Sequence, residues 1–361
     1  MSAAMKSSKG RLILQILGFM ALIMLSFYHW DMLQGKRGTM CLSVCVCVCV
    51  CVCVCVCVSY LIHCLLLLLL FSGLAVLQQR QEQRKQLLRE MCGDRVTSSD
   101  KKRILANMPK NKLANLIVDD KHGIIYCYIP KVACTNWKRV MFVLNQTEPY
   151  QDLMNISRDI VHHPNTFKLL NSFPLPGIKT RLEHYTKFLF VRDPFVRLIS
   201  AYRDKFQRKN EYFYNKYARD MLRKYSNQSN PPKSADKAFA SDVRPSFNNF
   251  IQYLLDPQTE KQEPFDEHWR QMHRLCHTCL IEYDFVGHQE SLQEDAEHLL
   301  KILKLQDDIK FPPSYDNMTS ATWVLDWFRA VPLDARRKLY KLYEMDFKLF
   351  GYGKPSTLLN D

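Results

Sequence analysis

Two segments of this sequence share one pattern, in which a short apolar run leads through a cation-bearing loop into a stretch of helical periodicity. The first covers residues 124–144 with Lys131 in its loop, and the second covers residues 188–206 with Arg192 in its loop. Short runs rich in β-branched and aromatic residues are typical of buried strands, whereas the spacing that follows is typical of helices. Two strand-loop-helix units predict an α/β fold with a mainly parallel central sheet flanked by helices.

The loop of the first segment, residues 130–136, is predicted to bind an anion. Backbone N–H groups and the dipole at the start of the following helix favour negative charge, and Lys131 adds a full positive charge beside them. Thr135 is expected either to cap the helix or to donate its hydroxyl to the same anion. The sequence lacks the pattern GxxxxGK[ST], which argues against an ordinary nucleoside triphosphate loop and against a nucleotide kinase.

The second segment repeats this logic. Asp193 is predicted to be the N-cap of its helix, and Pro194 suits the first helical position. Arg192 lies at the mouth of that helix, and helical spacing places Ser200 on the same side as Arg197. Two units that each present a cation and a hydroxyl suggest a ligand with phosphates at both ends.

At these residues the sequence resembles the Golgi carbohydrate sulfotransferases, in particular the branch that sulfates the 4-hydroxyl of N-acetylgalactosamine. The resemblance extends from about Gln78 to Asp361 and includes Glu267-His268-Trp269 and the closing Phe350-Gly351-Tyr352. It implies a P-loop-like sulfotransferase fold behind an N-terminal transmembrane anchor, with 3′-phosphoadenosine 5′-phosphosulfate as the sulfate donor. In this resemblance the first loop would hold the 5′-phosphosulfate and the second would hold the 3′-phosphate. The donor-binding residues that it implies are Pro130, Lys131, Val132, Ala133, Cys134, Thr135, Asn136, Arg192, Asp193, Pro194, Phe195, Val196, Arg197, Leu198, Ile199 and Ser200.

The resemblance also implies the reaction. Sulfate would pass to the 4-hydroxyl of N-acetylgalactosamine in chondroitin, with desulfated dermatan as a further acceptor and terminal N-acetylgalactosamine of N-glycans as the alternative. Such a transfer needs a base for the acceptor hydroxyl and positive charge at the departing phosphate, and Lys131 is predicted to supply that charge. No metal is implied. A catalytically silent glycan-binding membrane protein is the alternative from another class, and it would tolerate loss of Lys131.

Four histidines are candidates for the base, because histidine alone titrates near neutral pH without perturbation. His162 is preferred, since it lies in a polar connection between the two loops and matches a histidine of the family. His268 is predicted to contact the acceptor or to pack in the structure. The remaining candidates are His163 and His184.

Charge and composition limit the partners. The chain has 361 residues, is 47% hydrophobic and carries a formal net charge of +14, from 50 Lys and Arg against 36 Asp and Glu. This balance favours a nucleic acid, an acidic membrane or a sulfated glycan, although mixed charge is also the ordinary surface of a soluble domain. The resemblance selects chondroitin and dermatan chains and excludes nucleic acid. The basic, aromatic residues 211–225 could line a groove for such a polymer or could be core, and the helices predicted at 247–255 and 334–349 are expected to cover the sheet.

The N-terminal region predicts a membrane anchor. Leu12–Tyr28 is apolar and follows three basic residues, and a bilayer span needs about 20 apolar residues. Residues 1–11 are therefore predicted to be a cytoplasmic tail and residues 12–28 a signal anchor of a single-pass type II Golgi membrane protein, with a cleaved signal peptide as the alternative. A second apolar segment at Tyr60–Leu77 would return the rest of the chain to the cytoplasm, which conflicts with a lumenal sulfotransferase.

Val44–Val58 alternates strictly between valine and cysteine. Metal and disulfide frameworks do not place cysteine at every second position, whereas an alternating GT tract in a transcript encodes this alternation. We hypothesise that part of residues 41–77 is a mistranslated repeat or a retained intron, and an uninterrupted spliced message that encodes the alternation would refute this. Residues 29–91 are assigned to a stem and residues 92–361 to the lumenal sulfotransferase domain.

Two further features agree with a lumenal address. Cys276 and Cys279 could form a redox or metal pair, but a second pair at metal-ligand spacing is missing, which favours a disulfide or structural thiols. Four Asn-x-Ser/Thr sequons are candidates for glycosylation, at Asn145, Asn155, Asn227 and Asn317.

Overall fold

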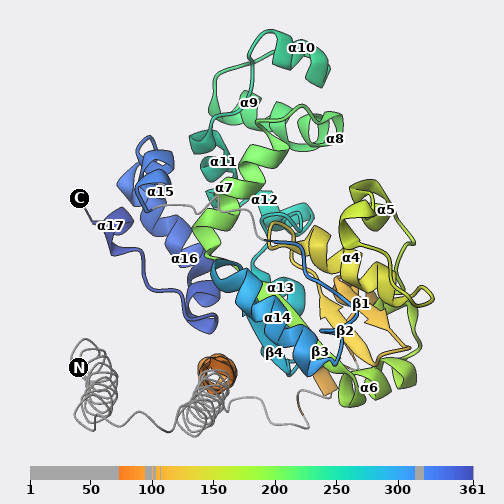
Figure 1. Cartoon of the computed structure of the whole chain (residues 1–361). Coiled ribbons are helices and arrows are strands. Elements are labelled where there is room, and N and C mark those ends of the chain that lie inside the picture. The colour runs from red at the N-terminus through yellow and green to blue at the C-terminus, as the bar shows by residue number, and fades with distance from the viewer. Residues whose placement is uncertain (1–72, 94–99, 101–102, 106, 314–320, 361) are drawn as a thin grey trace, which may run out of the picture. The chain divides into compact units, whose positions relative to one another are not determined.

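The computed structural model describes residues 73–93, 100, 103–105, 107–313 and 321–360 (Figure 1). The chain divides into two compact units, Met1–Leu74 and Ala75–Asp361, and the described residues belong almost entirely to the second. The predicted signal anchor, the Val-Cys alternation and Asn317 lie outside the described residues. Within the part that is described, no helix has the length and apolar character needed to cross a bilayer.

Four strands form one sheet in the order β1-β2-β3-β4. The strand β1 runs antiparallel to β2, whereas β2 with β3 and β3 with β4 are parallel pairs. The predicted mainly parallel sheet is therefore confirmed, and both predicted strand-loop-helix units are present as β2 with α4 and β3 with α7. The strands are β1 (Leu116–Asp119), β2 (Ile124–Cys127), β3 (Thr186–Val191) and β4 (Phe285–His288).

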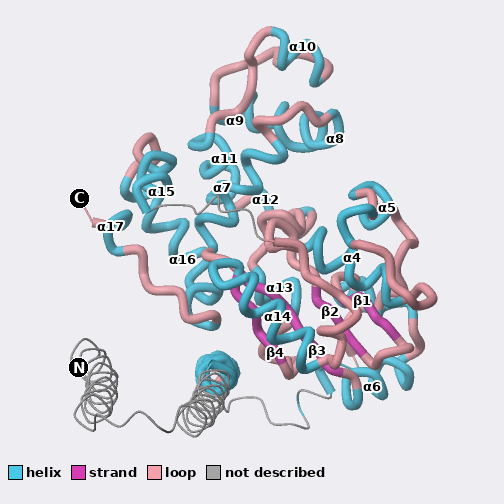
Figure 2. Tube along the Cα trace, viewed as in Figure 1, coloured by secondary structure: helices cyan, strands magenta, loops and turns pink. Residues whose placement is uncertain are grey.

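Helices account for most of the remaining structure (Figure 2). The helix α4 packs against β1, and α14 packs against β4. The α-helices that carry labels are α4 (Cys134–Leu144), α5 (Arg158–His162), α6 (Leu175–His184), α7 (Pro194–Lys205), α8 (Glu211–Phe213), α9 (Arg219–Tyr225), α10 (Ala235–Ala240), α11 (Phe247–Leu255), α12 (Thr259–Gln262), α13 (Met272–Cys276), α14 (Leu292–Ile302), α15 (Ala321–Phe328), α16 (Leu333–Leu349) and α17 (Ser356–Leu359). A π-helical turn, Tyr214–Ala218, joins α8 to α9, and 3-10 turns lie at Lys110–Leu113, Leu153–Asn155, Leu170–Ser172 and Gln289–Ser291.

The second unit contains two hydrophobic cores. One surrounds the sheet and includes Trp137, which packs against Phe188 and Phe190. The other contains no strand residue and is built mainly from α7, α9, α11 and α16, which lie away from the sheet in Figure 1. The helices α11 and α16 form where the sequence predicts them, but the expectation that they cover the sheet is wrong. Their apolar faces instead pack against α7 and against each other.

The aromatic stretch at residues 211–225 mostly joins this helical core. Tyr214 and Tyr217 are buried there, whereas Tyr212 is 57% exposed. The interpretation of these residues as core is therefore the correct one for Tyr214 and Tyr217.

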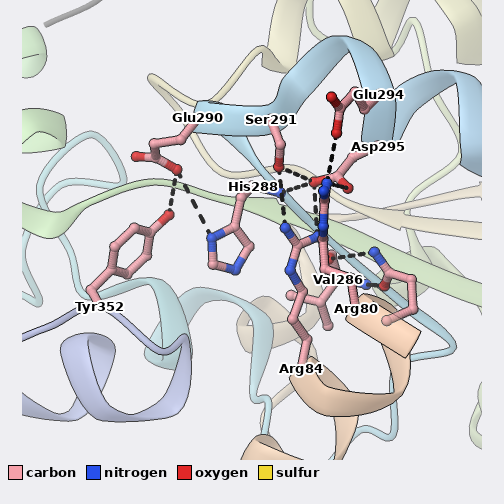
Figure 3. Close-up of polar contacts among 10 residues, drawn as sticks. Arg80, Arg84, Val286, His288, Glu290, Ser291, Glu294, Asp295 and Tyr352 are labelled. Atoms are coloured by element: carbon pink, nitrogen blue, oxygen red, sulfur yellow. Dashed lines mark hydrogen bonds and ion pairs between the residues drawn. The ribbon is translucent and has the colours of Figure 1, made fainter. Parts of the chain in front are cut away.

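A helix over residues 73–92 covers the edge strand β4 (Figure 3). The Gln81 side-chain amide donates to the Val286 carbonyl at 3.2 Å and accepts from the Val286 N–H at 3.1 Å, as a neighbouring strand would. Arg84 donates to the same carbonyl at 2.8 Å and pairs with Asp295 at 2.8 Å. Edge strands present unpaired backbone groups that promote aggregation. Residues that the sequence placed in the stem thus protect the open edge of the sheet.

Two disulfides cross-link distant parts of the second unit. Cys92 pairs with Cys279 and Cys127 pairs with Cys276, so the two cysteines of the Cys276-His277-Thr278-Cys279 segment do not pair with each other. Among the described residues, no group of three or more His, Cys, Asp or Glu side chains is arranged to hold a metal.

Candidate active site

A cavity of about 590 Å³ lies where β2 and β3 end. The segments that follow these two strands and α5 supply most of its walls, and the loop before α13 and Gln289 after β4 supply the rest. Ligands of α/β folds bind at the carboxyl ends of parallel strands, because loops and helix N-termini converge there. The two predicted anion loops therefore meet in one cavity.

Lys131 is held inside this cavity by an ion pair. Its backbone has a φ of 73°, in the left-handed region, and its Nζ lies 3.0 Å from Asp204 Oδ2 at the last turn of α7. Lys205 Nζ approaches the same oxygen at 3.2 Å. Burial lowers the pKa of Lys131, and Asp204 opposes this shift. Burial would raise the pKa of Asp204, but Lys131 and Lys205 outweigh it and hold that pKa well below its usual range.

The N-terminus of α4 is open toward the cavity. Ala133 occupies the N-cap position with a φ of 46°, and no side chain caps this helix. The N–H groups of a first helical turn lack partners within the helix, so an uncapped turn is suited to bind an anion. Thr135 is therefore not the cap, and the first of its two predicted roles is excluded. It lies inside the first turn, with its Oγ1 3.0 Å from His162 Nε2.

The N-terminus of α7 differs from that of α4, because a side chain caps it. Asp193 caps it as predicted and accepts hydrogen bonds from the Phe195 and Val196 amides at 2.9 Å each. The positive charge of this unit comes instead from Arg192, which lines the cavity and donates to the Lys131 carbonyl at 3.2 Å. Burial lowers the pKa of Arg192. Ser200 lines the same cavity from the second turn of α7.

Arg197 connects the cavity walls from behind. Its side chain is fully buried and donates to the Pro130 carbonyl at 3.0 Å and to the Glu267 and Arg270 carbonyls at 2.7 Å each. With its donors engaged by backbone oxygens, it positions two loops and does not face the cavity.

The structure divides the donor-binding residues implied by the sequence into two sets. Those that line the cavity are Pro130, Lys131, Ala133, Cys134, Thr135, Asn136, Arg192 and Ser200. Those that lie outside its lining are Val132, Asp193, Pro194, Phe195, Val196, Arg197, Leu198 and Ile199. Within the second set, Asp193 caps α7, Arg197 holds backbone carbonyls, and Val132, Phe195, Leu198 and Ile199 are buried in the hydrophobic cores.

Two of the four candidate histidines reach the cavity. His162 and His268 line it, whereas His163 and His184 do not. Burial, followed by the charges of Lys138 and Arg158, lowers the pKa of His162 to about 4, so its imidazole is neutral at neutral pH. His268 Nδ1 lies 2.7 Å from Asp266 Oδ1, and burial lowers its pKa despite that carboxylate.

Several residues that line the cavity have no predicted site role from sequence. Helical spacing could have identified Lys138, one turn after Cys134, and Asp204, one turn after Ser200. Glu267, which accepts from Tyr128 OH at 3.2 Å, lies in a segment that carries the family resemblance, but nothing local to it predicts a role in the cavity. The lining residues without an earlier assignment are Tyr128, Lys138, Arg158, Asp159, Asp204, Lys205, Glu267 and Gln289.

This geometry suits transfer of an anionic group to a hydroxyl, because buried cations, open backbone amides and a neutral imidazole converge in one cavity. Comparison with known proteins specifies the group: the chain belongs to the sulfotransferase family, which matches residues 114–353.

Among named proteins, the chain is similar to carbohydrate sulfotransferase 12 of Mus musculus, with 52% identity over 296 residues that cover 78% of this chain and 71% of the relative. The same protein of Xenopus laevis is 50% identical over 302 residues, which cover 79% of this chain and 72% of the relative. Carbohydrate sulfotransferase 11 of Rattus norvegicus is 39% identical over 293 residues, which cover 80% of each chain. No solved structure matches the chain. The family resemblance that the two loops predict is thereby confirmed.

Proposed function

We propose that this chain transfers sulfate from 3′-phosphoadenosine 5′-phosphosulfate to the 4-hydroxyl of N-acetylgalactosamine in chondroitin, and also in desulfated dermatan. The observation that carries this proposal is the partly buried Lys131, placed in one cavity with the uncapped start of α4 and with a neutral His162. The names of the similar carbohydrate sulfotransferases support a carbohydrate acceptor. The 4-hydroxyl rests on the resemblance to the branch that sulfates this position.

The cavity residues fit this donor. The open amides of α4 and the Lys131 ammonium suit its phosphosulfate end, whereas Arg192 and Ser200 suit its 3′-phosphate. The hydrogen bond from Arg192 to the Lys131 carbonyl joins the two loops, which would fix the distance between the sites for the two anionic groups of the donor. When bound, the donor supplies an activated sulfuryl group.

The chain's own residues supply charge and a proton acceptor. Neutral His162 has a free ring nitrogen that can accept the proton of the acceptor hydroxyl, and Thr135 Oγ1 at 3.0 Å orients the ring. Asp204 keeps Lys131 protonated, and the Lys131 ammonium stabilises negative charge that develops on the departing phosphate. His268 and Glu267 line the same cavity and are proposed to contact the acceptor sugar.

The pH dependence of activity tests the role of His162. A base must be neutral, and the pKa of His162 is about 4. The acid limb of kcat/KM should therefore fall near pH 4 rather than near the ordinary histidine pKa of about 6.5. The bound anionic donor favours the protonated imidazole and so raises the pKa of His162 in the substrate complex, which kcat reports. The acid limb of kcat should therefore lie at higher pH than that of kcat/KM.

Substitution separates His162 from its neighbour. His162→Asn is expected to reduce kcat by roughly 10²- to 10⁴-fold and to abolish this acid limb. His163→Asn is the matched control, since His163 does not line the cavity. Retention of full activity by His162→Asn would transfer the role of base to another residue.

An acceptor assay with the full chain tests the function itself. The protein is incubated with radiolabelled donor and one acceptor at a time: desulfated chondroitin, desulfated dermatan, or an N-glycan that ends in N-acetylgalactosamine. Disaccharides from the polymer products are then analysed. Label at the 4-position of N-acetylgalactosamine in chondroitin is expected. Preferential labelling of the N-glycan would change the acceptor, and donor binding without transfer to any hydroxyl would favour the silent glycan-binding protein.

We further propose that the catalytic unit lies in the Golgi lumen, behind a single-pass type II anchor at residues 12–28. Two disulfides support an oxidising compartment. The sequon residues Asn145, Asn155 and Asn227 are exposed, as glycosylation requires, and Asn317 is proposed as the fourth acceptor from its sequence. Enzymatic removal of N-glycans from the cell-expressed protein should increase its gel mobility, and an unchanged mobility would argue against this address.

A further inference from the structure

A second hollow, of about 540 Å³, lies next to the catalytic cavity and carries charge of one sign. Its basic lining includes Lys112, Arg270 and Arg274, and none of the described residues that line it is acidic. Neither the donor-binding loops nor the candidate base contribute to it. The function proposed above leaves this basic surface without a role.

A wall formed by a pair of hydrogen-bonded side chains separates the two hollows at one point. Asn115 lines the basic hollow, Glu267 lines the catalytic cavity, and Asn115 Nδ2 donates to Glu267 Oε2 at 3.1 Å. Tyr128 OH donates to the same oxygen at 3.2 Å. The buried Arg197 holds the carbonyls of both Glu267 and Arg270, so the loop that forms the wall is fixed on both sides. A linear ligand that leaves the cavity past Glu267 would enter the basic hollow.

Only some of the basic side chains in this hollow can pair with an anionic ligand. Glu260 engages Arg274 through two contacts of 2.9 Å and neutralises it. Burial lowers the pKa of His277, which bonds to the Lys112 carbonyl and does not add a charge at neutral pH. Lys112 is exposed, and no carboxylate of the described part of the chain forms an ion pair with it or with Arg270. These two cations are therefore available to a ligand.

We propose that this hollow binds the carboxylate of the uronic acid that flanks the sulfated sugar, as an extension subsite for a polyanionic acceptor. The proposal rests on the function proposed above and names how the acceptor chain is recognised. Chondroitin alternates a neutral amino sugar with an acidic one. The Glu267 carboxylate in the wall disfavours a uronate beside it, whereas Lys112 and Arg270 beyond the wall favour one. This charge order sets the register that presents the amino sugar to His162.

A length series of acceptors tests this subsite. The wild-type chain, Lys112→Gln, and Lys112→Gln combined with Arg270→Gln are compared on chondroitin di-, tetra- and hexasaccharides and on the polymer. In the wild type, KM should fall as the acceptor lengthens. Each solvent-accessible ion pair contributes up to about 1 kcal/mol, so Lys112→Gln should raise the polymer KM by up to roughly fivefold and the double variant by up to roughly thirtyfold, with kcat unchanged. The shortest acceptor that the enzyme uses should be affected least.

Controls separate this proposal from the one on which it rests. Lys301→Gln removes the same charge from an exposed position on α14, outside both hollows, and should leave every KM unchanged. Binding of fluorescent desulfated chondroitin to Lys131→Ala protein, with and without Lys112→Gln, gives a readout independent of turnover. If Arg270→Gln fails to fold, Lys112→Gln alone decides the test.

An unchanged polymer KM in Lys112→Gln, or an equal loss on all acceptor lengths, would overturn the subsite. Failure of the wild-type chain to sulfate any chondroitin acceptor would count instead against the proposed function.

Discussion

An Arg84→Ala variant is expected to lose about 3 kcal/mol of unfolding free energy, because it removes the nearer of the two cations that pair with a buried carboxylate. The Asp295 side chain has 0% exposure, and Arg84 Nη1 lies 2.8 Å from its Oδ2 (Figure 3). The Ser291 hydroxyl and the His288 N–H also donate to that oxygen, at 2.7 and 2.8 Å, but neither carries a charge. Arg80 Nη1 lies 3.8 Å from Asp295 Oδ1, beyond hydrogen-bond distance, so it compensates only part of the lost charge. Loss of Arg84 also leaves the Val286 carbonyl, at the edge of the sheet, with only the longer hydrogen bond from Gln81 among the described residues.

Denaturant unfolding of the full chain measures this effect. Lys85→Ala is the control on the same helix, since Lys85 pairs only with an exposed Glu82 among the described residues, and it should change stability little. Asp295→Asn keeps a hydrogen-bonding side chain but removes the charge, so in the Arg84→Ala background it should recover part of the loss. Equal stability of Arg84→Ala and Lys85→Ala would show that this ion pair does not hold the helix in place.

The same contacts lead toward the active site. Glu290, two residues after β4, accepts from the Asp193 N–H at 3.0 Å and from Tyr352 OH at 2.8 Å (Figure 3). Asp193 caps α7, and the adjacent Arg192 lines the catalytic cavity. Arg84→Ala is therefore expected to weaken donor binding at temperatures at which the protein remains folded, through displacement of the segment that follows β4.

Lys131→Ala is expected to reduce kcat by about 10²- to 10³-fold, the usual effect of removing one preorganised group that stabilises developing charge. The Lys131 side chain is 19% exposed, and its Nζ lies 3.0 Å from Asp204 Oδ2. A cation from solvent would therefore not easily take the place of this ammonium. Its loss also leaves Asp204 with only Lys205 as a close partner among the cavity lysines. The measurement is sulfate transfer to desulfated chondroitin with saturating donor.

Lys179→Ala is the matched control for charge and side-chain length, because Lys179 is exposed on α6 and does not line this cavity. Binding of adenosine 3′,5′-bisphosphate to the Lys131→Ala protein should persist through Arg192 and the α4 amides. Such binding would demonstrate that the variant is folded. Full transfer activity in this folded variant would remove Lys131 from the mechanism and would favour a different arrangement of the donor.

Local sequence determined much of this protein. Apolar runs predicted β2 and β3, Asp193 and Pro194 predicted the start of α7, and the apolar spacing of residues 247–255 predicted α11 with its observed bounds. These features depend on neighbours within a few residues, whose propensities and capping act without the rest of the chain. The anion loop and His162 were accessible from sequence for the same reason, together with the family resemblance.

Only the tertiary structure decided which of these residues share the cavity. Arg197 belongs to the predicted second loop, yet long-range carbonyl contacts with residues 267 and 270 turn it away from the ligand. Asp204 meets Lys131 across 73 residues of chain, Glu267 enters the cavity from a distant loop, and residues 81 and 84 protect a strand more than 200 residues later. Such partners are set by how the sheet and the two cores pack, and side-chain burial and pairing follow from that packing rather than from local sequence.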